Sequence, residues 1–185
     1  MTRTIAIVML AVLTGLGAAH AADDRGPAAG AKMLDIGTPP DQTGMPRTMA
    51  SMMGEKGMVF LFFRSAAWCP FCQAQLVELN GGVKEIEKRG YKLAALSYDP
   101  TDVLQGFTGK RGLSFTLLSD PKSEVIDRYG LRDPAYPVGN KAHGVPKPVI
   151  FIVGRDGTIK AKLFEESFKN RPSLALLLET IDKAK

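Results

Sequence analysis

The chain has 185 residues, 45% of them hydrophobic, which suits one domain with a substantial core. Its 24 Lys and Arg residues against 19 Asp and Glu give a net charge of +5, and the basic residues are scattered. Clustered basic patches with interleaved aromatic residues are missing from the sequence, so nucleic acid is not indicated as a partner.

The first residues have the pattern of a secretory signal peptide. Arg3 supplies a positive charge, residues 5–16 are apolar, and residues 19–21 (AHA) fit the small-x-small cleavage rule. We expect residues 1–21 to be removed and the mature protein to be periplasmic or secreted, in a bacterium, without a membrane span. A retained anchor is the alternative. Residues 22–33 are small and polar, and we expect a flexible leader.

The rest of the chain, residues 34–185, is predicted to form one domain. Residues 34–53 are rich in Pro, Gly and Met and form an N-terminal extension, which we expect to pack over the core. The hydrophobic periodicity then predicts strands at 58–63, 91–98, 114–118, 149–153 and 158–164, and helices at 70–89 (kinked at residues 81–82), from about 101 to 111, 122–129 and 172–184. Two strand–helix alternations imply parallel pairing with right-handed connections. This order predicts an α/β thioredoxin fold, with three α/β/α layers and a mixed central sheet.

The two cysteines of the chain, Cys69 and Cys72, stand where the first predicted strand gives way to a helix. At a helix start, residues i and i+3 share one turn, so the two sulfurs can form a disulfide. The unpaired N–H groups and the helix dipole both stabilise a thiolate there. Pro70 suits the first helical position, which needs no N–H group.

These features predict a redox-active disulfide between Cys69 and Cys72. Cys69, at the helix cap, is expected to attack, and Cys72, one turn further in, to resolve the mixed disulfide. A structural zinc site would need about four ligands. A purely structural disulfide would close a very short loop and restrain little chain entropy.

Four stretches in fixed order carry a resemblance to a known family. They are the strand leading into WCPFC at 68–72, FTLLSDP at 115–121 with VIDRYGL at 125–131, PVIFIV at 148–153 with RDG at 155–157, and residues 165–172. From residue 34 onward the chain resembles the thioredoxin-like redoxins of the alkyl hydroperoxide reductase/thiol-specific antioxidant (peroxiredoxin-like) family. The resemblance implies thiol redox chemistry without an organic cofactor.

The resemblance also implies residues around the dithiol. Thioredoxin-like proteins place a cis-proline opposite the two thiols, and Pro148 matches that position, with Pro146 as a competing candidate. A trans proline at a strand start is the alternative. Trp68 and Pro148 would shape the docking surface for the substrate, and Lys147 would tune the local field.

The chain departs from the family pattern at two points. Neither cysteine fits the peroxiredoxin signature Pro-x-x-x-Thr-x-x-Cys, and Lys147 is the basic residue where a peroxide-orienting arginine is expected. These departures favour dithiol–disulfide exchange. The buried acid of thioredoxins is also replaced, by Phe63, so a proton acceptor for Cys72 must come from Glu78, from Lys147 or from water.

The sequence therefore predicts an exported thiol-disulfide oxidoreductase that acts on a protein disulfide or thiol partner, with an external thiol reductant. The alternative is a thiol peroxidase that reduces hydroperoxides, with either cysteine as the peroxidatic one. A second alternative is a copper carrier that uses Cys69, Cys72 and His143. His143 is a weak candidate, because it can equally be a solvent-facing loop residue.

Overall fold

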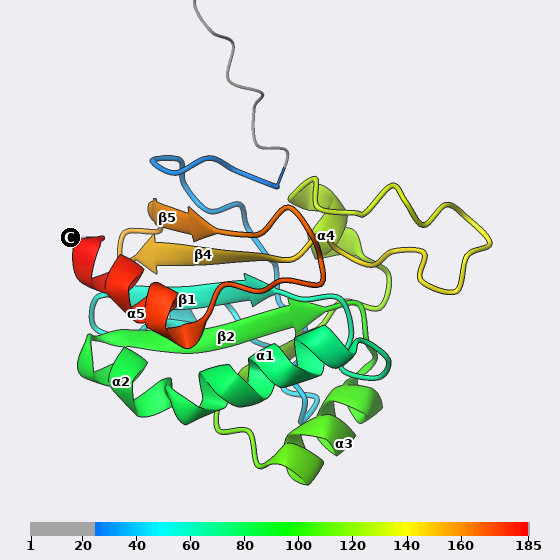
Figure 1. The fold of residues 1–185 in the computed structure, drawn as a ribbon, viewed down its shortest axis with the longest axis horizontal. Helices are drawn as coiled ribbons and strands as arrows, with labels where there is room; N and C mark the ends of the chain where they lie inside the picture. Colours follow the sequence, from blue (N-terminus) through cyan, green and yellow to red (C-terminus); the bar gives the residue numbers. More distant parts are fainter. Residues whose placement is uncertain (1–24, 185) are drawn as a thin grey trace, which may run out of the picture.

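The computed structural model describes residues 25–184, so the expected signal peptide at 1–21 lies outside the described residues. One five-stranded sheet has the strand order β3-β2-β1-β4-β5 (Figure 1). The strands are β1 (Gly57–Phe62), β2 (Tyr91–Ser97), β3 (Thr116–Ser119), β4 (Val149–Gly154) and β5 (Ile159–Leu163). The helices are α1 (Pro70–Gly81), α2 (Val83–Lys88), α3 (Thr101–Arg111), α4 (Glu124–Arg128) and α5 (Leu174–Lys183), and Ala50–Met52 form the short 3-10 helix η1.

The sheet is mixed, as the thioredoxin fold requires. Central β1 pairs in parallel with β2 and antiparallel with β4, so that Phe60 lies between Ala94 and Phe151. β2 pairs in parallel with β3, and β4 and β5 form an antiparallel hairpin. The predicted fold class is confirmed. All six residues of β1 are buried, because helices or the N-terminal extension cover both faces of the sheet.

Two hydrophobic cores lie on the two faces of the sheet. Val59 and Leu61 of β1 face the first core, whereas Met58, Phe60 and Phe62 face the second. The first core takes its helical residues from α1, α2, α3 and α5, and it contains both cysteines. The second core is closed by α4 and by the N-terminal extension. The dithiol therefore belongs to the α1/α5 layer.

The predicted helix at 70–89 is two helices in the structure. A Cβ atom on Gly82 would collide with the side chain of Leu174, at the start of α5. Any larger residue where α1 ends and α2 begins would therefore have to displace the Leu174 side chain. At the start of α3, Pro100 is the N-cap and no side chain caps the helix. Asp99, which could have supplied that cap, bonds elsewhere.

The N-terminal extension covers the second core as expected. Met33 and Met52 are buried in this core together with Met58 of β1. Within the expected leader, residues 30–33 pair with residues 157–159, at the turn between β4 and β5 and the first residue of β5. Gly30 N–H donates to Ile159 O, and Ile159 N–H donates to Ala31 O, each at 2.8 Å. Within residues 25–184 no helix has the length and apolar character to cross a membrane.

Candidate active site

The dithiol lies at the N-terminus of α1. Cys69 is the N-cap, Pro70 occupies the first helical position, and the backbone N–H of Cys72 donates to Cys69 Sγ at 3.3 Å. The two sulfurs are joined as a disulfide, with Cα atoms 5.3 Å apart. Cys69 is 2% exposed and Cys72 is fully buried. The helix start therefore holds both sulfurs in one turn, below the molecular surface.

A buried carboxylate positions the loop before Cys69. Asp99 follows β2 and accepts hydrogen bonds from Ala66 N–H at 2.6 Å, Ser65 Oγ at 2.7 Å and Ser97 Oγ at 2.8 Å. Burial raises the pKa of Asp99, and these three donors oppose that rise. The network ties the end of β1 to the end of β2, so the loop that leads to the dithiol has one defined path.

A buried guanidinium contacts the sulfurs from the opposite end of the chain. Arg171 Nη2 lies 3.4 Å from Cys72 Sγ and 3.9 Å from Cys69 Sγ. Arg171 Nη1 donates to the carbonyl oxygens of Phe168 and Asn170, whereas its buried Nε has no hydrogen-bond partner. The structure gives Arg171 no ion pair among the described residues. Burial, and secondly the charge of Arg64, lower the pKa of Arg171 to about 10.

Arg64 supplies the second buried guanidinium. Its side chain is 1% exposed at the end of β1, and Nη2 donates to Tyr136 Oη at 2.6 Å. Nη1 lies 3.5 Å from Asp133 Oδ2, and the ring of Phe168 lies 4.2 Å from its Cζ. Arg64, whose buried Nε also has no hydrogen-bond partner, thus has a carboxylate and a phenol beside it, whereas Arg171 directs its charge at the disulfide.

Trp68 and Pro148 lie at the surface and in a small cavity, respectively. Trp68, 44% exposed, donates through Nε1 to Tyr98 Oη at 2.9 Å. Pro148 lines a small cavity together with Gln75 and Arg171, on the side of the dithiol. Both amide atoms of buried Gln75, one turn after Cys72, have no hydrogen-bond partner.

The expected cis bond before Pro148 is wrong, because the described peptide bonds are all trans. The N–H of Lys147 donates to Leu131 O at 2.7 Å, and Pro146 bridges to Arg132. The chain therefore enters β4 already extended, and a trans bond continues that path. Lys147 itself is half-buried just before β4.

The structure does not bring His143 to the cysteines as a metal site. His143 Nε2 lies 3.0 Å from Arg132 Nη1, which can only donate, so Nδ1 carries the proton and donates to Tyr136 O at 3.0 Å. Among residues 25–184 no group of three His, Cys, Asp or Glu side chains could hold a metal ion. Glu78, considered above as a proton acceptor, accepts the N–H of Leu174 at 2.8 Å.

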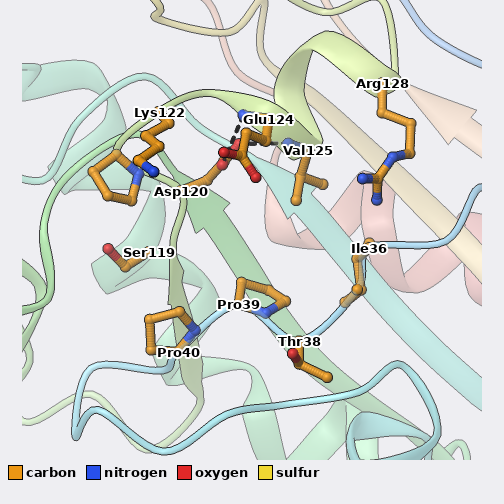
Figure 2. A pocket seen from close by; sticks show the side chains of 12 residues that line it. Ile36, Thr38, Pro39, Pro40, Ser119, Asp120, Lys122, Glu124, Val125 and Arg128 are labelled. Carbon is orange, nitrogen blue, oxygen red and sulfur yellow. Dashed lines mark hydrogen bonds between the residues drawn. The ribbon is translucent and has the colours of Figure 1, made fainter.

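Figure 2 shows a separate pocket of about 340 Å³ between the N-terminal extension and the start of α4. Asp120 in this pocket accepts the backbone N–H groups of residues 124–126 at 2.9, 3.0 and 2.9 Å. Arg128 donates to Asp35 O at 2.6 Å. These charged groups hold α4 and the extension in place, and the pocket is lined by neither cysteine.

Sequence analysis missed Arg64, Asp99 and Arg171. Asp99 had a detectable signal, because carboxyl ends of neighbouring parallel strands meet at one sheet edge. Arg171 lies in the 165–172 stretch that carried part of the resemblance, but only the fold places it beside the sulfurs.

Comparisons with known proteins show which family the chain resembles. The AhpC/TSA family model matches residues 29–162, more than half of the chain. Peroxiredoxin Bcp of Escherichia coli is 29% identical over 121 residues, which cover 65% of this chain and 76% of that protein. The fold is similar to peroxidoxin BcpB of Mycobacterium tuberculosis, with a TM-score of 0.73, 23% identity and 85% and 97% of the two chains covered. Xanthomonas campestris peroxiredoxin Q gives a TM-score of 0.66 at 19% identity, covering 80% and 91%.

A family model over residues 29–162 and a dithiol at the first turn of α1 lead to one conclusion. The chain belongs to the AhpC/TSA family of peroxiredoxin-like redoxins and is a thiol-based oxidoreductase.

Proposed function

We propose that this protein is a thiol peroxidase that reduces hydroperoxides with Cys69 and Cys72. The observation that carries the proposal is the burial of both sulfurs, 2% and 0% exposed, beneath Arg171. A folded protein disulfide needs an exposed sulfur to dock against, whereas the terminal oxygen of a hydroperoxide is small. The relatives named peroxiredoxins support the same activity. This function replaces disulfide exchange as the preferred hypothesis.

The cycle uses the two cysteines in turn. The Cys69 thiolate attacks the terminal oxygen of ROOH, the O–O bond breaks, and RO⁻ takes a proton to leave as ROH. Cys69 is then a sulfenic acid. Cys72 attacks the Cys69 sulfur, the S–O bond breaks, and water leaves as the disulfide forms. Two equivalents of an external thiol reopen the disulfide and are themselves oxidised to a disulfide.

Cys69 is assigned as the peroxidatic cysteine because of its place in α1. Its sulfur accepts the N–H of Cys72, so a negative charge on this sulfur is stabilised by the helix N-terminus. Cys72 lies three residues later in the same turn, within reach of the Cys69 sulfur. We also propose that the protein works in the periplasm or outside the cell, since residues 1–21 have the signal-peptide pattern.

The test uses the single tryptophan, which adjoins Cys69. The disulfide of a protein comprising residues 22–185 is first reduced. The protein is then mixed rapidly with equimolar hydrogen peroxide, and Trp68 fluorescence is followed. Oxidation at least about 100-fold faster than that of a free thiol, with loss of two thiols per protein, is expected for a peroxidase. Cys72→Ser should react equally fast and stop at a sulfenic acid, whereas Cys69→Ser should react slowly. A wild-type rate equal to that of a free thiol would refute the proposal.

Dithiol–disulfide exchange remains the second candidate. The C-x-x-C pair at a helix N-cap favours it, as does the missing Pro-x-x-x-Thr-x-x-Cys signature. Reduction of insulin disulfides by the reduced protein, combined with slow peroxide oxidation, would establish this activity instead.

A further inference from the structure

The two sulfurs do not share Arg171 equally. Nη2 lies 3.4 Å from Cys72 Sγ and 3.9 Å from Cys69 Sγ, and the two contacts come from the same nitrogen. Cys69 already has a donor of its own, the N–H of Cys72 at 3.3 Å. Each sulfur is therefore paired with a different positive group, Cys69 with the helix start and Cys72 with the guanidinium.

We propose that Arg171 is a catalytic residue that stabilises Cys72 as a thiolate in both halves of the cycle and so directs the external reductant to Cys69. This role rests on the proposed function and goes beyond it, because the family resemblance assigns no task to this position. Arg171 reaches the sulfurs from the segment before α5, far from the strand start where the family arginine is expected.

In the oxidising half, the Cys72 thiolate attacks the sulfenic sulfur of Cys69. The S–S bond forms, the S–O bond breaks, and the departing hydroxide takes a proton to become water. In the reducing half, a reductant thiolate attacks Cys69 Sγ and the S–S bond breaks. Its electron pair moves to Cys72, which leaves as a thiolate facing Arg171, and a second reductant thiol then releases Cys69. A lower-pKa thiol is the better leaving group in such exchange.

Arg171 suits this task better than Arg64. Arg64 donates to Tyr136 and lies beside Asp133, whereas Arg171 donates to two carbonyl oxygens and to the sulfurs. Buried groups are screened little by salt, so the charge of Arg171 acts on Cys72 at nearly full strength. Arginine also keeps its proton at neutral pH even when burial lowers its pKa to about 10.

The first experiment measures the Cys72 thiolate alone, in the Cys69→Ser background. The thiolate absorbance near 240 nm is followed against pH for this parent and for the parent with Arg171→Gln, Arg171→Lys or Lys169→Gln. Arg171→Gln should raise the midpoint by about 1–3 pH units, the usual effect of one close opposite charge. Arg171→Lys should restore part of the shift, and Lys169→Gln, an exposed residue of the same segment, should leave it unchanged.

This titration separates the two proposals, because it needs no peroxide and no turnover. An unchanged midpoint in both Arg171→Gln and Arg171→Lys would overturn the role of Arg171 while leaving the peroxidase intact. A slow peroxide reaction with a shifted midpoint would refute the peroxidase and keep the role. Circular dichroism on each variant checks the fold, and Arg171→Lys carries the test where Arg171→Gln does not fold.

The second experiment reads the direction of reduction. The disulfide form is treated with substoichiometric thiol, quenched with iodoacetamide, and analysed by mass spectrometry. Attack at Cys69 leaves Cys72 free, so alkylation should fall on Cys72 at least about tenfold more often in the wild type. Arg171→Gln should bring the two sites close to equal. Preferential alkylation of Cys69, or a ratio that Arg171→Gln does not change, would contradict the proposal.

Discussion

Two buried charged residues, Asp99 and Arg171, flank the dithiol, and they differ in how fully they are hydrogen-bonded. Asp99 accepts three hydrogen bonds, at 2.6, 2.7 and 2.8 Å, from the loop before Cys69 and from β2. Arg171 keeps a buried Nε without a partner and has no ion pair among the described residues. A fully bonded charge holds backbone in place, whereas an incompletely bonded one retains interaction energy for the reacting atoms. The difference separates Asp99, which holds the loop before Cys69 in place, from Arg171, which acts on the reacting sulfurs.

Removing the carboxylate of Asp99 should have the largest effect on stability. Asp99→Ala leaves the Ala66 N–H and two serine hydroxyls buried without an acceptor. At about 1–3 kcal/mol for each unsatisfied group, the free energy of unfolding should fall by at least about 3 kcal/mol. Urea denaturation of the disulfide form measures this loss. A decrease below about 1 kcal/mol would show that the loop does not depend on Asp99.

Asp99→Asn should have a smaller effect, about 1 kcal/mol near neutral pH, because the amide oxygen still accepts the Ala66 N–H. Its pH dependence is more informative. The folded-state pKa of Asp99 is raised above 3.8, so its contribution to stability is complete below about pH 3.8 and is lost as the pH rises through the raised pKa. The free energies of unfolding of the wild type and of Asp99→Asn are measured against pH. The stability of the wild type relative to the variant should fall as the pH rises above 3.8. A constant difference would mean that Asp99 stays protonated throughout.

Among these buried residues, removing the charge of Arg171 should change the free energy of unfolding least. Arg171→Met deletes a desolvated guanidinium that has no carboxylate partner, and we expect a change within about 1 kcal/mol. Peroxide turnover should nevertheless fall at least about tenfold, since Cys72 loses the group that stabilises its thiolate. Urea denaturation and peroxide turnover, measured on one preparation, test the expected stability and the expected loss of activity. Destabilisation comparable to that of Asp99→Ala would erase the contrast between the two residues.

The surface contact of Trp68 sets the lower limit of the series. Tyr98→Phe removes the acceptor of the Trp68 Nε1–H bond at a half-exposed position. Water can replace the lost partner, so the cost should be about 0.5 kcal/mol, and turnover should stay within about twofold. A larger drop in turnover would place the Trp68 ring in contact with substrate.

Much of this architecture could be predicted from sequence because it follows from local patterns. The apolar run at 58–63 and the turn at 155–157 marked central β1 and the β4–β5 hairpin within a residue or two. The two glycines at 81–82 also marked the kink in the predicted helix, and the structure ends α1 and begins α2 at that place. Pattern also located the dithiol, and the structure places it at the predicted helix cap.

The surroundings of the dithiol could not be predicted in the same way. Asp99 meets Ala66 across 33 residues, and Arg171 meets Cys72 across 99. The parallel pairing of β1 and β2 gives a signal for the first pair, whereas no periodicity links the second, which only the packing of α5 against the first core brings together. The cis-proline expectation was wrong for a related reason, because the hydrogen bond from Lys147 N–H to Leu131 O fixes the path into β4.

The late position of Arg171 in the chain has a consequence during synthesis. Cys69 leaves the ribosome 102 residues before Arg171, so β1, α1 and the neighbouring strands exist before the guanidinium does. Through that interval the two thiols are uncovered and lack their cation. The growing chain thus passes through a stage in which its cysteines can react with any thiol or oxidant. Their reactivity becomes selective only when the last helix docks and brings Arg171 to them.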